Sequence, residues 1–280
     1  PLVFTEAHKI PVGTVKLTVL DVGQGLSTVV QTASHALVYD TGAKFSATSD
    51  MGQSVVITFL RSQGIAKLNT LVISHGDNDH IGGADSLLTG IPTDQLLTSV
   101  PQQLSQYSPS QCKAGQSWVW DKVIFTLLSP QPGQLPSDND NSCVLKIQAE
   151  QSVALLTGDI EAEAESWLVK TYQAELKADV LVAPHHGSQT SSTGAFLQAV
   201  HPKVVVIPAG YRNQFGHPHE EVLLRYKAMQ INAFNNSEEG SILVNMENAL
   251  TVESWRAREG RYWNYASPKR LNKDLGIFPP

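Results

Sequence analysis

The sequence has little of what marks several classes of protein. Its two cysteines, Cys112 and Cys143, are too few in 280 residues to imply a disulfide framework, and without Cys-x-x-Cys spacing they exclude a cysteine-rich zinc site. We expect Cys143, at the start of a predicted strand, to be a small buried residue. No run of about 18 apolar residues is present, so no segment is predicted to span a membrane. A net charge of −6 and a pI near 5.8 do not indicate a general nucleic-acid binder, which relies on basic surface.

The sequence also lacks an initiator methionine and a basic, apolar signal segment within residues 1–15. We therefore expect a single domain, residues 1–280, that is a piece of a larger protein. With 41% hydrophobic and 16% charged residues, the chain can bury a sizeable core and is not predicted to be disordered. Residues 102–116, rich in Gln and Ser, and residues 130–141, rich in Pro and Asn, are predicted to be long surface loops.

Four potential metal ligands occupy six positions directly after the apolar run 68–73. They are His75, Asp77, Asp79 and His80. At the end of a buried strand these groups are desolvated and repel one another unless divalent ions turn them into ligands. Side chains at i and i+2 of an extended segment point the same way, so His75 and Asp77 can converge on one ion while Asp79 and His80 reach a second. The alternative is a solvated acidic loop followed by a helix that starts at Asp79.

Three other apolar runs also end in a residue that can serve a metal site. The run 36–39 precedes Asp40, the run 153–157 precedes Gly158 and Asp159, and the run 180–183 precedes Pro184, His185 and His186. A short apolar run followed by a glycine or an acid predicts a buried strand that delivers a residue to the sheet edge. Several such strands at one edge would build a site.

Strands and helices are predicted to alternate along the chain. Strands are expected at 15–22, 27–31, 35–40, 68–73, 123–128, 143–148, 153–157, 180–183 and 204–208. Helices are expected at 54–63, 80–88, 162–172, 193–199 and 218–229. This alternation favours an α/β architecture with helices on both outer faces.

In their order along the chain, several of these motifs resemble the signature of the metallo-β-lactamase superfamily. They are Asp40-Thr41-Gly42, the His-x-Asp-x-Asp-His motif at 75–80, Gly158-Asp159 and His185-His186-Gly187. A second set resembles, more narrowly, the C-terminal domain of ComEC-type DNA-uptake channel proteins: the segment 21–25, Asn141-Ser142, the segment 184–188 and the segment 216–219. The resemblance implies a four-layer αββα sandwich in which two similar halves meet along a cleft.

The resemblance also implies the roles of individual residues. His75 and Asp77 would hold the first ion, Asp79 and His80 the second, and Asp159 would bridge the two. A further histidine of the second ion is assigned to His185, so that His186 faces substrate or a neighbour of the ligands. The alternative for these two histidines is a structural role in a helix cap or in the core. Asp40 would orient ligands by hydrogen bonding, the alternative being an ordinary turn aspartate.

One departure from the superfamily bears on the metal. No histidine lies between His80 and His185, and the ComEC-like position there is around Asp140-Asn141-Ser142. An oxygen ligand from that segment would make the ligand set of the first ion chemically harder. Such a set favours manganese as first choice and leaves zinc or magnesium as alternatives. Ser142 and Ser188 are expected to touch the ligands or the substrate. No small organic cofactor is expected.

Two metals in a cleft favour hydrolysis by a metal-activated water, and phosphodiester cleavage suits such a site. Asp79 and His217 are expected to be catalytic, with His217 contacting phosphate or protonating the departing oxygen; the alternative for His217 is a solvated residue at a helix start. The resemblance implies a nuclease that degrades the non-imported strand during natural transformation, with single-stranded DNA and the membrane channel of the same polypeptide as partners. It also implies a bacterial inner-membrane protein whose domain lies on the periplasmic or exterior face.

Two alternative functions remain from the sequence: a non-catalytic module that guides DNA or docks onto the channel, and a hydrolase of another ester or lactone. The segment 256–280 interleaves basic and aromatic residues, which can support backbone contacts and base stacking on a nucleic acid. The alternative for this segment is a last strand that ends near Arg256 and a solvated basic tail.

Overall fold

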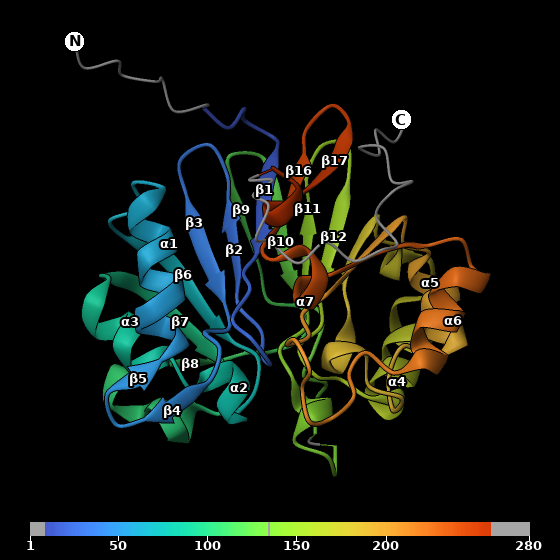
Figure 1. Cartoon of the computed structure of the whole chain (residues 1–280), viewed down its shortest axis with the longest axis horizontal. Helices are drawn as coiled ribbons and strands as arrows, with labels where there is room; N and C mark the ends of the chain where they lie inside the picture. Colours follow the sequence, from blue (N-terminus) through green and yellow to red (C-terminus); the bar gives the residue numbers. More distant parts are fainter. Residues whose placement is uncertain (1–8, 134, 259–280) are drawn as a thin grey trace.

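Two β-sheets lie face to face at the centre of the molecule, and helices cover the outer face of each sheet (Figure 1). The computed structural model describes residues 9–133 and 135–258. The first sheet has eight strands, in the spatial order β17 (Leu250–Ser254), β16 (Ile242–Met246), β1 (Val15–Val19), β2 (Thr28–Gln31), β3 (Ala36–Tyr39), β6 (Leu68–Ile73), β7 (Thr93–Thr98) and β8 (Ser110–Gln111). A separate hairpin is formed by β4 (Lys44–Ser46) and β5 (Ser49–Asp50).

The second sheet has seven strands. Their spatial order is β15 (Asn232–Asn235), β14 (Val204–Ile207), β13 (Val180–Val182), β12 (Val153–Leu156), β11 (Leu145–Gln148), β10 (Val123–Leu127) and β9 (Ser117–Trp120). The four strands β12 to β15 run parallel, and so do β3, β6, β7 and β8 of the first sheet. The carboxyl ends of the parallel strands in each sheet deliver the loops of the candidate site.

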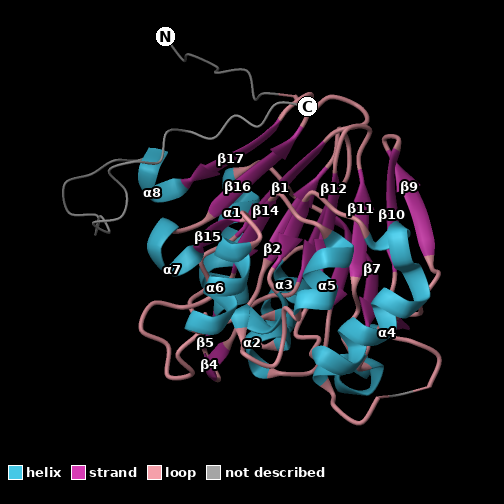
Figure 2. Ribbon diagram, turned by 90° about the vertical axis from the view of Figure 1, so that its right-hand side faces the viewer, coloured by secondary structure: helices cyan, strands magenta, loops and turns pink. Residues whose placement is uncertain are grey.

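Helices form the two outer layers. On the first sheet lie the π-helical turn η1 (Gly52–Val56), α1 (Ile57–Ser62) and α3 (Ala84–Gly90); on the second lie α4 (Ala162–Tyr172), α5 (Gly194–Val200) and α6 (Glu220–Ala228), which face the viewer in Figure 2. Short helices are α2 (Asn78–Ile81), η2 (Pro101–Tyr107), η3 (Asn139–Asn141), η4 (Gln173–Leu176), η5 (Pro184–Gly187), α7 (Asn236–Glu239) and α8 (Trp255–Arg258). Every helix of the described residues is too short or too polar to cross a bilayer.

Three apolar clusters hold the layers together. The central cluster joins both sheets through side chains such as Leu17, Phe125 and Leu156, which are fully buried. The other two lie between each sheet and its helices. The parallel strand β14 has all four residues buried because it is covered on both faces, which explains its unbroken Val and Ile sequence. Full burial of each such side chain contributes about 1.5–3 kcal/mol.

The predicted four-layer α/β architecture is confirmed, and the strand at 68–73 and the helix at 162–172 have the predicted bounds. The helix predicted at 54–63 begins earlier, in the π-helical turn at Gly52. The helix predicted at 80–88 is interrupted between α2 and α3. A Cβ at Gly83 would lie 2.4 Å from the backbone nitrogen of Gly52, so the chain bends at a close backbone contact that only glycine permits.

The prediction of one long loop at 102–116 is wrong. This segment contains η2 and β8, and its Cys112 is buried. Polar Gln and Ser side chains hide these elements in the sequence because β8 is an edge strand and only Leu104 and Cys112 of this segment are buried.

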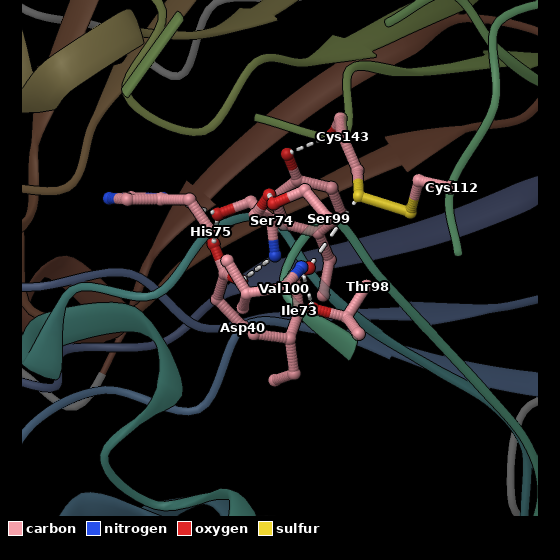
Figure 3. Close-up of a disulfide and its surroundings, with 10 residues drawn as sticks. Asp40, Ile73, Ser74, His75, Thr98, Ser99, Val100, Cys112 and Cys143 are labelled. Carbon is pink, nitrogen blue, oxygen red and sulfur yellow. Dashed lines mark hydrogen bonds between the residues drawn. A yellow bond between two sulfur atoms is a disulfide. The ribbon is translucent and has the colours of Figure 1, made fainter. Parts of the chain in front are cut away.

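The two cysteines form a disulfide, which corrects the expectation that Cys143 is only a small buried residue. Figure 3 shows this bond beside Ser74 and His75. The backbone N–H of Cys143 donates to the carbonyl of Ser74 at 2.9 Å, and the hydroxyl of Tyr39 donates to the carbonyl of Cys143 at 2.6 Å. The bond therefore ties the edge of the first sheet to the start of β11 in the second, directly behind the predicted metal loop.

Candidate metal centre

Three of the predicted metal ligands and one further histidine converge at the carboxyl ends of the parallel strands. Asp79, His80, Asp159 and His186 each offer an atom within 4.8 Å of the others. The loop after β6 supplies the first two, the loop after β12 supplies Asp159, and the turn after β13 supplies His186. This end of the sheets lies near α2 in Figure 1.

Three distances within this cluster match those of ligands that share an ion, while Oδ2 of Asp79 lies farther from Nε2 of His80, at 3.9 Å. Oδ1 of Asp159 lies 3.1 Å from Nε2 of His80, and Oδ2 of Asp159 lies 3.4 Å from Nε2 of His186. Oδ2 of Asp79 is 3.1 Å from Nε2 of His186. Two ligand atoms, each about 2.1 Å from one ion, stand roughly 3.0–3.4 Å apart at octahedral or tetrahedral angles.

Hydrogen bonds fix which ring nitrogen of each histidine faces the cluster. Nδ1 of His80 lies 2.8 Å from Oδ2 of Asp40, and Nδ1 of His186 lies 2.9 Å from the carbonyl oxygen of Pro208. Both partners only accept, so each Nδ1 carries a proton and each Nε2 is the nitrogen that takes up a second proton or binds a metal ion. These two Nε2 atoms are 3.2 Å apart. Two facing lone pairs repel unless a proton or a metal ion lies between them.

The charges of the cluster favour a cation in this place. Burial would lower the pKa of His80, but the negative charges of Asp159 and Asp40 raise it well above its usual value. Burial also opposes the shift at His186, whose pKa the charge of Asp159 raises to about 9. Burial would raise the pKa of Asp79, yet hydrogen bonding from His186 and the charge of His80 lower it to about 2. The carboxylates therefore hold positive charge at the imidazoles, and a divalent ion can replace it.

Asp40 and Ser74 form the support behind the ligands. The backbone N–H and the hydroxyl of Ser74 both donate to the Asp40 carboxylate at 2.7 Å. Asp40 is fully buried and has the left-handed φ of 60° that a sharp turn requires. The sequence analysis did not single out Ser74, although its place between the strand and His75 was the available signal.

His75 lies beside His80, with the two ring centroids 4.1 Å apart. The hydroxyl of Ser74, whose proton goes to Asp40, accepts from Nδ1 of His75 at 3.0 Å. Nε2 of His75 is buried and has no hydrogen-bond partner among the described residues. It lies 3.5 Å from Oδ2 of Asp77 and 4.0 Å from Oδ2 of Asp159. A buried lone pair aimed at two carboxylates fits a second ion beside His75.

The structure brings His186 into the cluster, where the sequence analysis favoured His185. Nε2 of His185 is 3.8 Å from Oδ2 of Asp159, while its Nδ1 lies 3.2 Å from Oε1 of Glu161. Its side chain is 21% exposed, whereas that of His186 is 2% exposed. The turn η5 places both residues at left-handed φ values of 48° and 54°, so the strand's alternation does not carry through to them.

The segment around Asn141 does not bring an oxygen to the cluster. The amide of Asn141 bonds the backbone of Leu135 and Ser137, and Asp140 accepts from backbone N–H groups at the start of α4. The hydroxyl of Ser142 accepts from the backbone N–H of Asp159 at 3.3 Å and so helps to position that carboxylate.

Ser188 contacts Thr190. Its hydroxyl lies 3.0 Å from that of Thr190.

His217 lies on the outer side of the histidine group. Its ring centroid is 5.6 Å from that of His185 and 6.3 Å from that of His186. Burial and the charges of these neighbours lower the pKa of His217 to about 4. A neutral ring at this position favours hydrogen bonding to an anion over donation of a proton.

Most of the predicted basic tail, residues 259–280, lies outside the described residues. Arg256 is engaged within the fold, where its guanidinium donates to the carbonyl of Ser237 at 2.7 Å and lies 3.4 Å from Asp21. Arg258 lies over the ring of Trp255, 5.2 Å from its centroid.

Comparison with known proteins gives a consistent picture. A family described as the metallo-beta-lactamase superfamily matches residues 20–211. The chain is 37% identical to competence protein ComA of Neisseria gonorrhoeae over 233 residues, which are 83% of this chain and 32% of that protein. It is 30% identical to ComE operon protein 3 of Bacillus subtilis over 262 residues, covering 84% of this chain and 33% of that protein. The chain thus spans about a third of the length of these relatives.

Solved structures share the fold. The metallo-beta-lactamase fold protein YhfI from Bacillus subtilis superposes with a TM-score of 0.53 at 14% identity, covering 79% of this chain and 95% of that one. Igni18, a metallo hydrolase from Ignicoccus hospitalis, gives a TM-score of 0.50 at 16% identity, with 83% and 99% covered.

Proposed function

The chain belongs to the metallo-β-lactamase superfamily, and from this premise we propose that it is a metal-dependent nuclease that hydrolyses phosphodiester bonds of single-stranded DNA. The proposal rests on one observation: imidazoles and carboxylates gather around both carboxylate oxygens of the buried Asp159. Its metal-dependent hydrolase class follows from the superfamily and the cluster, and its DNA substrate from the similarity to competence proteins.

We propose that two divalent ions bind here, with manganese as first choice and zinc or magnesium as alternatives. Three imidazoles and three carboxylates would hold them: His75 and Asp77 one ion, Asp79, His80 and His186 the other, and Asp159 both. This mixed set of nitrogen and oxygen ligands is harder than a histidine-only site, which favours manganese. When bound, the ions would lower the pKa of a water molecule and neutralise charge on the phosphodiester oxygens.

The protein's own residues hold these ligands in place. Asp40 keeps Nε2 of His80 directed at the cluster, and the Pro208 carbonyl does the same for His186. Ser142 supports the backbone of Asp159. Such outer partners orient ligands and raise their basicity.

Two histidines are free to act on the substrate. His185 sits between Asp159 and Glu161 and is partly exposed, so it can move a proton near the reacting group. His217, neutral at physiological pH, can donate a hydrogen bond to a phosphate oxygen through Nε2, since its Nδ1 is buried.

The setting we propose is a DNA-uptake protein of the bacterial inner membrane, in which this domain lies on the periplasmic or exterior face beside the membrane channel of the same polypeptide. Two observations support it. The relatives named as competence proteins are about three times longer than the matched segment. The Cys112–Cys143 disulfide is typical of proteins that fold outside the reducing cytoplasm.

The proposal is tested by incubating the protein with end-labelled single-stranded DNA and Mn²⁺. We expect the wild type to cleave the DNA, and Asp79→Ala to lose more than about a hundredfold in rate, since even an outer partner of a metal ligand is worth 10- to 100-fold. Asp85→Ala is the matched control, because this carboxylate is 54% exposed on α3 and lies outside the cluster.

Equal cleavage by wild type and Asp79→Ala would reject the proposed site. If neither protein cleaves DNA but both bind it, the non-catalytic DNA-guiding role would replace the nuclease.

A further inference from the structure

Exposed aromatic side chains gather on two loops beside the metal cluster. Among the Phe, Tyr and Trp residues that the structure describes, four are strongly exposed. Their exposed fractions are 64% for Phe45, 59% for Tyr211, 54% for Phe215 and 52% for Trp255. Three of the four fall on the β4–β5 hairpin and on the loop 208–219, which we call the rim loop. Single exposed aromatics need no explanation, but a group around a reaction site does.

The β4–β5 hairpin is fastened to the metal-binding loop. The amide of Asn78, the first residue of α2, accepts from the backbone N–H of Lys44 at 3.2 Å and donates to its carbonyl at 3.0 Å. Phe45 follows Lys44 directly. Its exposed ring is therefore held next to the turn that carries Asp79 and His80.

The rim loop is exposed, yet it is ordered from within by Asn213. The amide of Asn213 donates to the carbonyls of Gly210 at 2.9 Å and His217 at 2.6 Å, and it accepts from the backbone N–H of His217 at 2.9 Å. Residues 211, 212 and 214–216 are exposed around this closed turn. The loop thus presents its aromatic side chains in a preformed arrangement, which lowers the entropy lost when a ligand binds.

A series of nearly parallel rings leads from the rim loop to the metal cluster. The ring centroids of Phe215 and His217 are 5.7 Å apart with planes inclined by 26°. Those of His217 and His186 are 6.3 Å apart with planes inclined by 25°. A flat group stacked on the outer face of Phe215 would continue this series.

These two loops carry too few positive charges to bind a nucleic acid by electrostatic attraction alone. Lys44 is the one Lys or Arg residue of the β4–β5 hairpin, and Arg212 is the one Lys or Arg residue of the rim loop. The guanidinium of Arg212 lies over the ring of Tyr211, 5.2 Å from its centroid. Nucleic-acid sites with little positive charge must obtain affinity elsewhere, and base stacking on aromatic rings supplies it without sequence preference.

We propose that Phe215 is a stacking platform for a base of single-stranded DNA, with Tyr211 and Arg212 beside it, and that this contact sets the preference for single strands. The inference rests on the proposed nuclease function and assigns its specificity to the rim loop. Bases in a duplex are already stacked and paired, so they cannot lie on Phe215 without being extruded. A base of an unpaired strand can stack on Phe215 without the free-energy cost of extrusion.

The test compares two labelled oligomers of twelve units, an oligothymidylate and an abasic deoxyribose-phosphate chain of the same length. Dissociation constants are measured by fluorescence anisotropy in Ca²⁺, with intact DNA verified on gels. We expect wild type to prefer the oligothymidylate, and Phe215→Ala to weaken that binding by roughly five- to hundredfold, the range for loss of one stacked base. Binding of the abasic chain should change less than about twofold, because a phosphate contact is insensitive to the ring.

Two controls separate stacking from general damage. Phe215→Trp keeps an aromatic face and should retain the preference. Leu224→Ala removes an apolar side chain of similar exposure, 56%, from the neighbouring helix α6 and should change neither constant.

The inference is overturned if wild type binds the two oligomers equally or binds neither, or if Phe215→Ala affects both equally. Absence of Mn²⁺-dependent cleavage together with an intact, Phe215-dependent preference would reject the nuclease and leave the stacking site standing.

Discussion

Replacement of Asp40 by asparagine isolates the support behind the metal ligands. The Asp40 carboxylate is fully buried and accepts hydrogen bonds from the backbone and hydroxyl of Ser74, and from Nδ1 of His80. Asparagine has the same shape, and its one oxygen can still accept from the Ser74 backbone. Its NH₂ group then faces Nδ1 of His80, so this nitrogen must accept, and the proton moves to Nε2.

A proton on Nε2 removes the lone pair that a metal ion needs. Loss of a hydrogen bond to a charged group costs about 1.5–3 kcal/mol, which is roughly ten- to hundredfold in affinity and agrees with the effect of removing an outer partner of a metal ligand. We therefore expect Asp40→Asn to bind Mn²⁺ about ten- to hundredfold more weakly. Calorimetric titration of the purified protein with MnCl₂ measures this directly.

Asp121→Asn is the matched control. Asp121 also accepts from a histidine, His35, at 3.0 Å, but it lies in the β9–β10 turn at the opposite end of the sheets. The Asp121→Asn substitution should lower the thermal stability of the protein and leave its Mn²⁺ affinity unchanged. Unchanged affinity in Asp40→Asn, or an equal fall in both variants, would refute the tautomer argument.

Three further outcomes are expected. Replacing Cys112 and Cys143 by serine opens a loop of 31 residues and should lower the free energy of unfolding by about 3–4 kcal/mol in denaturant titration; a change under about 1 kcal/mol would contradict this estimate. Burial would raise the pKa of the Asp121 carboxyl, but hydrogen bonds outweigh it and lower this pKa in the folded protein. The ionised carboxylate therefore stabilises the fold above the pKa of an unfolded aspartate, about 3.9, and this stabilisation is lost as pH falls further. Asp121→Asn should therefore lose less stability than wild type between about pH 4 and pH 2, and equal losses would contradict a stabilising role of the Asp121 carboxylate. Gly25→Ala places a Cβ 2.4 Å from the carbonyl oxygen of Asp79, which should cost about 1–3 kcal/mol in thermal unfolding and weaken Mn²⁺ binding, with unaltered binding as the contrary result.

The sequence was sufficient for the strand ends that build the site. Hydrophobic runs before His75 and Asp159 locate buried strands and the residues they deliver, because strands covered on both faces are rich in apolar residues, as in the sequence of β12, Val-Ala-Leu-Leu. Within each sheet, parallel neighbours bring such ends to one edge, but the meeting of His75 and Asp79 from the first sheet with Asp159 from the second also depends on how the two sheets pack face to face.

The choice between His185 and His186 was not available from the sequence. Two successive left-handed residues rotate the side chains in a way that no strand or helix period describes. The Cys112–Cys143 bond was hidden for a different reason, since it joins elements of two sheets whose proximity depends on the whole fold. Polar edge elements such as β8 escape notice because solvent tolerates any side chain on their open face.

The central claim is that Asp159 lies between two bound metal ions. Crystals grown with Mn²⁺ and measured by anomalous diffraction test it most directly. We predict two peaks, one beside His75 and Asp77 and one among Asp79, His80 and His186, with Asp159 between them. A single peak, or none at these side chains, would contradict the account.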